Sequence, residues 1–377
     1  MPESLYIHIP FCIKKCLYCD FLSVTYNEAL ARAYTDALCK ELVLKKDVAG
    51  ELKTIYIGGG TPTILPDECF RQLFTCLQNN YSLSPSPKIT VEANPGTVDE
   101  SKIKMLLSLG VNRISIGVQS FNDDELKTLG RIHTSNEALK AIEAIKNSGI
   151  NNFSIDLIYG IPGQTMKTWE ETLSKTAAFT ISPAHISSYE LTPEKDTPLY
   201  GLIESGKIKI PDEELVLEMY GSAIDYLRNK GYEHYEISNF ALPRFRCLHN
   251  LNYWDRGEYI GAGAGAHSFI RSFRSKNTDD IRRYIKDLNK GIIPEAESTE
   301  IKRDDAIKEF IFLGLRKTEG ISLAKAKELG LDMPAVCREL IEDGHLEVEG
   351  DYLRLTRKGL VVSNSVIVML FEGFGLD

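Results

Sequence analysis

The sequence predicts an α/β fold: an open, partial (β/α)6 barrel followed by an α+β extension. Between Leu5 and about Leu191, short β-branched or apolar runs alternate six times with helical patterns. This alternation is typical of a parallel sheet covered by helices. Six repeats are fewer than the eight of a closed barrel, so we expect a curved sheet that stays open. Beyond Pro211 the alternation ends, which predicts a change of architecture.

The six expected strands are short and bounded by helical patterns or turns. They are Leu5–Ile9, Thr54–Ile57, Lys88–Glu92, Arg113–Val118, Phe153–Ile158 and His185–Glu190. Helices are expected to begin at Asn27, to run from Asp99 to Gly110, and to run from Ser135 to Gly149. Active sites of barrels and open α/β sheets lie beyond the carboxyl ends of their strands. We therefore expect the chemistry in the loops that follow these strands.

Three regions are predicted: a barrel over 1–210, a mixed α/β extension over 211–300 and a winged-helix-like module over 301–377. The extension is expected to open with a helix from Asp212 to about Asn229, and residues 232–273 to form strands and loops. In the last region, helical runs at Ala306–Leu315, Leu323–Glu328 and Pro334–Asp343 precede short strands at Leu346–Val348 and Tyr352–Leu355. Residues 301–377 carry 11 Lys and Arg against 14 Asp and Glu. This net negative charge argues against DNA binding and favours packing on protein or covering a substrate.

Charge and hydropathy exclude several classes of function. The net charge of −9 disfavours nucleic acid as the main partner. The longest apolar run near the end, Val366–Phe371, is too short to span a bilayer. The first residues lack the basic and then apolar layout of a secretory signal. We expect a cytoplasmic protein without stable membrane insertion, whose eight cysteines stay reduced.

Three cysteines, Cys12, Cys16 and Cys19, lie within eight residues directly after the first expected strand. Soft thiolate ligands select iron–sulfur clusters, zinc or copper(I). A cubane cluster normally takes four cysteines, so three local ligands leave one iron open for a small molecule. Zinc and mere packing remain alternatives, although zinc usually prefers two paired spacings and no second pair is present.

Other polar and glycine positions also lie at strand ends. The triplet Gly58-Gly59-Gly60 follows the second strand, where glycine lets backbone amides approach a ligand; a tight turn is the alternative. Polar side chains in near-apolar strands need partners, which favours a site over a surface, although a structural network would also satisfy them. These side chains are Glu92, Gln119, Arg131 and Asp156. His8 is either a hydrogen-bonded core residue or a neighbour that tunes a metal site. The glycine-rich stretch 261–268 is interpreted as a tight turn.

The spacing Cys-x3-Cys-x2-Cys, with an aromatic residue before the last cysteine, resembles the radical S-adenosylmethionine (SAM) superfamily. More closely, residues 1 to about 375 resemble the oxygen-independent coproporphyrinogen III oxidase family and its HemW-type heme chaperone branch. The opening Tyr6-Ile-His-Ile-Pro-Phe-Cys12 and the later stretch Ile155–Thr165 carry this resemblance. It implies a radical-SAM partial (β/α)6 barrel with a [4Fe–4S] cluster on the three cysteines. The fourth iron would chelate the amino and carboxylate groups of SAM.

The resemblance also implies roles for individual residues. Gly59, Gly60 and Thr61 match the SAM-binding loop of the family, and Tyr6 and Tyr18 match positions that line the cofactor pocket. Glu92 would accept from the methionyl amine or a ribose hydroxyl. The remaining matches lie around a second SAM in the oxidase: Gln119, Arg131 and Asp156.

Two features bear on the choice between oxidase and chaperone. The oxidase typically carries a further cysteine two residues past the third ligand and an N-terminal extension, whereas here Asp20 and Phe21 follow Cys19 and the chain starts almost on the first strand. His249 to Trp254 matches the HNxxYW signature of the chaperone branch. Histidine is a natural axial ligand of heme iron, so His249 is the expected ligand, with a packed loop as the alternative. Cys247 could assist, but its spacing does not match covalent c-type attachment.

The leading prediction is therefore a SAM-binding [4Fe–4S] protein that binds heme and delivers it to acceptor proteins. The alternative is oxidative decarboxylation of coproporphyrinogen III through a SAM-derived radical, with an electron donor to the cluster as a further partner. A third option is a cluster that only senses oxidation state.

Overall fold

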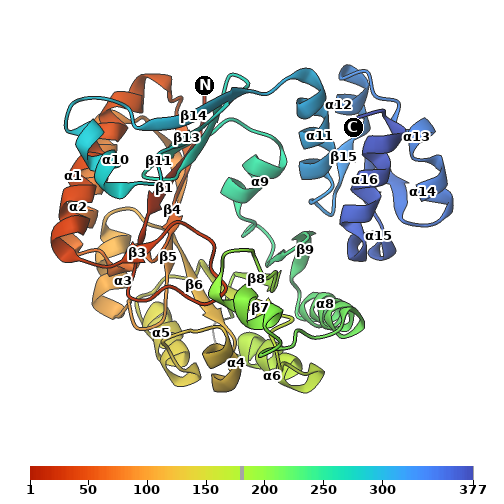
Figure 1. The fold of residues 1–377 in the computed structure, drawn as a ribbon, viewed down its shortest axis with the longest axis horizontal. Helices are drawn as coiled ribbons and strands as arrows, with labels where there is room; N and C mark the ends of the chain where they lie inside the picture. The colour runs from red at the N-terminus through yellow and green to blue at the C-terminus, as the bar shows by residue number, and fades with distance from the viewer. Residues whose placement is uncertain (179–181, 377) are drawn as a thin grey trace.

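Six parallel strands form the centre of a curved sheet (Figure 1). The computed structural model describes residues 1–178 and 182–376, so the final residue of the predicted 301–377 region lies outside it. The central strands are β1 (Ser4–Ile9), β4 (Leu52–Gly59), β5 (Leu83–Ala93), β6 (Arg113–Gln119), β7 (Phe153–Tyr159) and β8 (His185–Glu190). All six agree with the predicted positions within a few residues. The prediction of a partial (β/α)6 barrel is therefore confirmed.

The chain that follows β8 extends the sheet at both edges. Within the described residues the sheet has nine strands, in the order β11-β1-β4-β5-β6-β7-β8-β10-β9. β11 (Ile260–Ala262) is parallel to β1, whereas β10 (Asn239–Ala241) is antiparallel to β8 and to β9 (Glu233–Glu236). The 211–300 stretch thus adds edge strands to the barrel.

Helices cover the outer face of the sheet (Figure 1). They are α1 (Glu28–Lys45), α2 (Asp67–Asn80), α3 (Glu100–Ser108), α4 (Asp123–Thr128), α5 (Ser135–Asn147), α6 (Met166–Ala177) and α8 (Glu213–Asn229). The short helix α7 (Pro198–Glu204) instead contacts the cysteine loop, where the Leu199 N–H donates to the Leu17 carbonyl at 2.9 Å. Asn27, Asp99 and Asp212 cap their helices by accepting a backbone N–H, as their positions predicted. The helix expected from Ser135 is capped one residue earlier, by Thr134 in a capping box with Glu137.

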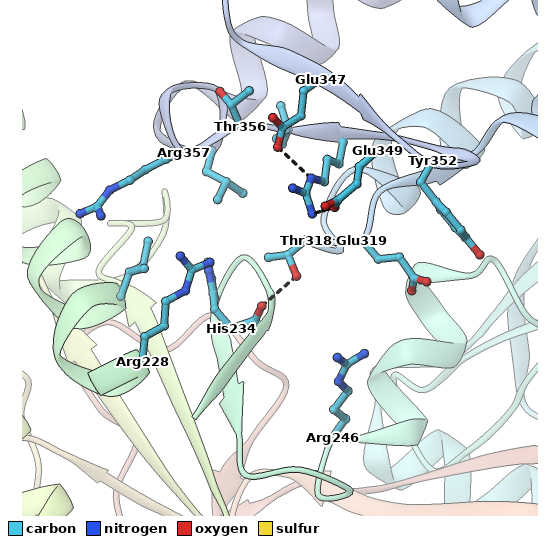
Figure 2. Close-up of a pocket in the computed structure, with 14 residues that line it drawn as sticks. Arg228, His234, Arg246, Thr318, Glu319, Glu347, Glu349, Tyr352, Thr356 and Arg357 are labelled. Atoms are coloured by element: carbon cyan, nitrogen blue, oxygen red, sulfur yellow. Dashed lines mark hydrogen bonds and ion pairs between the residues drawn. The ribbon is translucent and has the colours of Figure 1, made fainter. Parts of the chain in front are cut away.

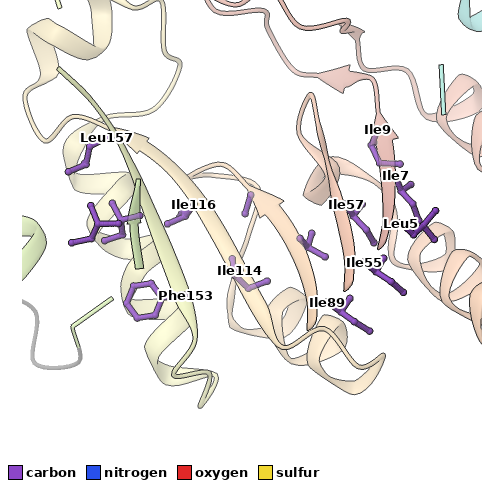
Figure 3. Close-up of a cluster of buried hydrophobic side chains, with 14 of the residues drawn as sticks. Leu5, Ile7, Ile9, Ile55, Ile57, Ile89, Ile114, Ile116, Phe153 and Leu157 are labelled. Carbon is purple, nitrogen blue, oxygen red and sulfur yellow. The ribbon is translucent and has the colours of Figure 1, made fainter. Parts of the chain in front are cut away.

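Successive side chains of a strand point to opposite faces, so each central strand has an apolar set and a polar set. The apolar set forms the core (Figure 3); it includes Leu5, Ile7, Ile9, Ile55, Ile57, Ile89, Ile114, Ile116, Phe153 and Leu157, all at most 3% exposed. The alternate positions carry polar groups, for example Arg113, Ser115 and Gln119 on β6. The interior of the barrel is therefore polar, which is unusual for a buried space and marks it as the place to look for a site.

The C-terminal module has the predicted helix–helix–helix–wing order. It comprises α11 (Arg303–Gly314), β15 (Ile321–Ser322), α12 (Leu323–Glu328), α13 (Met333–Val336), α14 (Arg338–Glu342), β16 (Leu346–Glu349), β17 (Tyr352–Leu355), α15 (Arg357–Val361) and α16 (Ser363–Gly373). The helix expected over Pro334–Asp343 is split in two at Cys337. The module faces α8 and β9 across a cavity of about 580 Å³ (Figure 2). Arg357, one of the residues that line it, forms a bidentate ion pair with Asp225 of α8 at 2.5 and 2.6 Å.

The expectation of strands and loops over 232–273 was incomplete, because α9 (Leu248–Trp254) lies within it. His, Asn, Tyr and Trp are weak helix formers, so the local sequence did not indicate this helix. Packing stabilises it instead: α9 contacts β4 on one side and α11 on the other, and the Arg256–Glu309 ion pair joins its end to α11 at 2.7 Å. The glycine-rich stretch is a turn, as expected, with Gly263 and Gly265 at positive φ.

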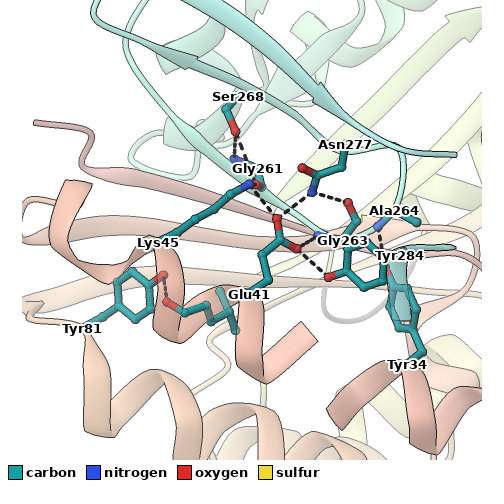
Figure 4. Close-up of polar contacts among 11 residues, drawn as sticks. Tyr34, Glu41, Lys45, Tyr81, Gly261, Gly263, Ala264, Ser268, Asn277 and Tyr284 are labelled. Carbon is teal, nitrogen blue, oxygen red and sulfur yellow. Dashed lines mark hydrogen bonds and ion pairs between the residues drawn. The ribbon is translucent and has the colours of Figure 1, made fainter. Parts of the chain in front are cut away.

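A second sheet, of β12 (His267–Ile270), β13 (Phe273–Asn277) and β14 (Glu295–Glu300), precedes the module, and α10 (Ile281–Leu288) packs on α1. The completely buried Glu41 of α1 ties this part to the barrel (Figure 4). Its carboxylate accepts from the Gly263 N–H at 2.8 Å, the Asn277 amide at 2.6 Å and the Tyr284 hydroxyl at 2.5 Å. Lys45 pairs with the same carboxylate at 2.6 Å.

Among residues 1–178 and 182–376, no helix combines the length and apolar character needed to cross a lipid bilayer.

Candidate cofactor site

A cavity of about 460 Å³ lies at the carboxyl ends of the central strands, where the sequence predicted the chemistry. Eleven of the thirteen predicted site residues line it: Cys12, Cys16, Tyr18, Cys19, Gly59, Gly60, Thr61, Glu92, Gln119, Arg131 and Asp156. Tyr6 and His249 do not. The structure also adds residues that the sequence did not single out, such as Tyr56, Arg113 and Ser115. All three side chains point to the same face of the sheet as those of Glu92 and Asp156. The alternation of side chains along each strand was therefore the signal that could have found them.

The three cysteines lie on the loop between β1 and α1, and each is half-buried. Cys12 belongs to the short strand β2 (Phe11–Cys12), which pairs with β3 (Val24–Thr25) and so closes the loop at its base. The loop is also held from the barrel side. Arg131 Nη1 donates to Cys16 Sγ at 3.4 Å, and the Thr61 hydroxyl donates to Cys12 Sγ at 3.7 Å.

The Cys12 and Cys19 thiols are protonated while no metal is bound, because burial raises the pKa of Cys12 and raises that of Cys19 to about 11. Metal ligation would replace these protons. Within the part of the chain that the structure describes, no three His, Cys, Asp or Glu side chains converge on one point as the ligands of a single ion do. In a cubane each cysteine ligates a different iron, so this donor set fits a cluster without such convergence.

The glycine triplet at the end of β4, whose last two residues are Gly58 and Gly59, is required by close packing. A Cβ on Gly60 would stand 2.6 Å from the carbonyl oxygen of Phe11 and 3.0 Å from Cys12 Sγ. Gly59 has a φ of +113°, and a Cβ there would stand 2.5 Å from the ring of His8. The triplet therefore lets the end of β4 touch the cysteine loop directly, and it forms a backbone wall of the cavity.

Two buried carboxyl groups face the cavity, Glu92 on β5 and Asp156 on β7. Glu92 accepts from the Tyr56 hydroxyl at 2.8 Å and from the Gly59 N–H at 3.1 Å, and burial raises its pKa to about 7. Asp156 accepts from Ser115 at 3.0 Å and Ser154 at 3.3 Å, and burial raises its pKa too. Neither group makes an ion pair with any described residue. Such acids suit a ligand that carries positive charge or several hydrogen-bond donors.

Gln119 and Arg131 also hold unused hydrogen-bonding groups. Gln119 ends β6 with a φ of 68°, a left-handed conformation that is uncommon for non-glycine residues, and its Oε1 is buried without a hydrogen-bond partner among the described residues. Arg131 donates to Asn94 Oδ1 at 2.5 Å and the Gly117 carbonyl at 2.7 Å, while its Nε is unpartnered. Unsatisfied buried groups at one cavity wall point to a polar ligand.

Tyr6 and His8 lie behind the wall. The Tyr6 hydroxyl bonds His8 Nδ1 at 2.9 Å, and the Tyr6 ring stacks on Tyr56 with centroids 6.3 Å apart. His8 Nε2 bonds the carbonyl of Leu22 at 2.9 Å, so both ring nitrogens are engaged. His8 thereby anchors the far end of the cysteine loop to β1, as a hydrogen-bonded core residue does.

His249 lies away from the cysteines, near the amino end of β4. Its Nδ1 bonds Thr54 Oγ1 at 2.8 Å, its Nε2 bonds the Tyr253 hydroxyl at 2.9 Å, and its side chain is 3% exposed. Its ring stacks on Tyr56 with centroids 5.2 Å apart. It borders a separate cavity of about 380 Å³ at the amino ends of β5 to β7. To ligate heme iron, His249 would therefore have to give up one of these hydrogen bonds. The partner of Nε2, Tyr253, lies on the same helix.

Comparisons with known proteins agree with this architecture. Residues 6–176 match the Radical SAM superfamily, and residues 301–362 match the HemN C-terminal domain. The structure of Escherichia coli coproporphyrinogen III oxidase (HemN) is similar to 98% of this chain and 90% of its own, with a TM-score of 0.83. At 23% sequence identity this likeness establishes the fold alone.

Relatives of higher identity match from end to end. The heme chaperone HemW of Bacillus subtilis is 37% identical over 374 residues, covering 97% of this chain and 98% of the relative. That of Escherichia coli is 35% identical over 385 residues, covering 97% of each chain. Identity at this level over complete lengths, together with the radical SAM match, establishes the family: this chain belongs to the heme chaperone HemW family of radical SAM proteins.

Proposed function

We propose that this protein binds a [4Fe–4S] cluster through Cys12, Cys16 and Cys19, with SAM beside it in the same cavity. The observation that carries the proposal is that three thiols, a glycine wall and two carboxyl groups line one cavity. When bound, a reduced cluster of this kind supplies an electron to the SAM sulfonium. The protein supplies ligands, orientation and exclusion of water.

The residues divide by their chemistry. Gly59, Gly60 and Thr61 offer backbone contact to the methionyl end of SAM, and Tyr18 closes the cavity beside the cysteine loop. Glu92 accepts hydrogen bonds from the amine or a ribose hydroxyl. The hydrogen-bonding groups that remain available are expected to contact the rest of this ligand or a second SAM; they belong to Gln119, Arg131 and Asp156. Tyr6 supports the cavity wall through its ring contact with Tyr56.

SAM affinity is expected to rise with pH through about 7. Burial raises the pKa of Glu92 to about 7, so the carboxyl group is neutral below that pH and must lose its proton to accept from a cationic or donor ligand. At pH 6 this costs about tenfold in affinity relative to the plateau above pH 8. Isothermal titration of the cluster-loaded protein with SAM at several pH values measures it. Glu92→Gln should bind more weakly with a flat profile, and a flat wild-type profile would contradict the assignment.

We further propose that the protein binds heme and passes it to acceptor proteins in the cytoplasm, with a reductant for the cluster as a second partner. End-to-end similarity to proteins named heme chaperone supports this over an oxidase. All eight cysteines are free thiols, which suits a reducing compartment. The direct test is anaerobic incubation with SAM, a strong reductant and coproporphyrinogen III. Formation of protoporphyrinogen IX over many turnovers would replace this proposal by the oxidase.

His249 is the proposed heme ligand, and two variants with different expected results test it. Burial lowers the pKa of His249 to about 3, so the ring is neutral and able to ligate. His249→Ala should lower heme affinity at least tenfold and change the heme absorption spectrum. Tyr253→Phe removes the hydroxyl that engages Nε2 and should keep or increase affinity. Unchanged spectra in His249→Ala, with the protein folded and SAM still bound, would exclude this ligand.

A further inference from the structure

The cavity that His249 borders is strongly basic. It lies at the amino ends of β5, β6 and β7, beneath the barrel, and has a volume of about 380 Å³. Among the described residues that line it, the charged ones are Lys88, Arg113, Arg244 and Arg246, with Glu233 as the single acid. Glu233 pairs with Arg246 at 3.1 Å. Three positive charges are left over, in a protein whose net charge is −9.

Arg113 gives the second, independent sign of a missing anion. Arg113 is buried, with 6% of its surface exposed, and its Nη1 donates to the Phe245 carbonyl at 3.2 Å. Its Nε has no partner, and it makes no ion pair with a described residue. The acid that acts on it electrostatically, Asp156, lies in the cofactor cavity. A buried guanidinium without a counter-ion is unfavourable, so the site is built to receive negative charge.

The same cavity has an apolar side and groups that ligate iron. Phe245 and Leu248 line it, and Leu248 is 47% exposed, so an apolar side chain is accessible to a ligand there. Cys247 and His249 line it as well. Lys88 and Arg244 lie at its open side, exposed to solvent. Cations, an apolar surface and an imidazole together match a flat apolar ligand that carries carboxylates and a metal.

From this arrangement we propose that heme docks at the base of the barrel, with its propionate carboxylates on Lys88 and Arg244 and its ring against Phe245 and Leu248. This inference rests on the proposed heme-binding function and specifies where on the protein heme binds. The heme site and the cofactor cavity are then back to back, separated by Arg113 and Cys247, which line both. Heme and SAM consequently bind at the same time.

The competing location is the mouth of the cofactor cavity, where Lys14 and Lys15 lie beside the exposed Ile13 and Phe21. Heme there would cover the SAM site, so the two locations predict different competition. They also predict different responses to neutralising each pair of cations.

The experiment titrates the cluster-loaded full chain with ferric heme and with its dimethyl ester, followed by visible absorption, with and without saturating SAM. Lys88→Gln/Arg244→Gln should weaken heme binding about tenfold, and the ester should bind the wild type as weakly as heme binds this variant. Neutralising Lys14 and Lys15 should leave heme affinity unchanged. Arg282→Gln/Lys286→Gln, a Lys and an Arg exposed on α10, is the charge-matched control and should also leave it unchanged.

The outcomes separate the two levels of the proposal. Loss of heme binding in Lys14→Gln/Lys15→Gln would overturn the basal site, and so would displacement of heme by SAM. Either result would leave the proposed chaperone function unaffected. Equal affinity of heme and its ester would likewise overturn the basal site. A wild-type protein that binds no heme at all would overturn the proposed function and the site together.

Discussion

Replacing Cys16 by alanine is expected to abolish assembly of the cluster. The cysteine loop offers three thiols, and a cluster held by three protein ligands has none to spare. Removal of Cys16 also leaves the Arg131 guanidinium, which now donates to its sulfur at 3.4 Å, facing an empty position. Iron and acid-labile sulfide per chain, measured after anaerobic reconstitution, should fall from four of each to near zero, and SAM binding should fall with them.

Cys76→Ala is the matched control for this variant. Cys76 is also half-buried, but it lies on α2, where its thiol donates to the carbonyl of Cys39 at 3.5 Å. This variant should reconstitute fully. Equal iron content in the two variants would mean that Cys16 is not a ligand and would leave only two cysteines in the loop to hold a cluster.

The sequence was sufficient for the features that depend on local patterns. The six strands follow from apolar runs and the helix starts from capping residues, since both are short-range signals. Glu92 and Asp156 were identifiable because a carboxyl group inside an apolar strand needs a partner. Tyr56 and Arg113 were missed because a tyrosine, or an arginine at the end of a strand, gives no signal of its own. Their role becomes visible only when it is known which side chains of the strand point into the barrel.

Features that depend on the path of the chain were not predictable. The segment from Leu242 to Leu248 passes beneath the barrel and delivers α9 to the amino end of β4. No local periodicity encodes that path, so the separation of His249 from the cysteines came only from the structure. The helix α9 was not predicted either, because its sequence has weak helix propensity and the helix is stabilised by tertiary contacts.

Replacing Glu41 by alanine is expected to cost about 3–5 kcal/mol in free energy of unfolding, the usual result of removing one partner of a buried charged pair. The variant leaves Lys45, whose side chain is 12% exposed, without its counter-ion, although it keeps the Gly261 carbonyl at 2.8 Å. It also leaves the Asn277 amide and the Tyr284 hydroxyl without their acceptor (Figure 4). Because these donors come from the chain after β11, the loss should loosen the attachment of this segment to α1.

Urea-induced unfolding, followed by circular dichroism, measures this loss of stability. Two further variants, one at Glu41 itself and one elsewhere on the same helix, serve as comparisons. Glu41→Gln keeps an acceptor oxygen but removes the charge, so its loss should fall between wild type and alanine. Glu28→Ala removes an exposed carboxylate of the same helix, paired with Arg32 at 2.8 Å, and should leave the transition nearly unchanged. If Glu41→Ala unfolded at the same urea concentration as Glu28→Ala, the buried carboxylate would not be what fastens the extension to the barrel. The strand β11 beside β1 would then depend on backbone pairing and apolar packing alone.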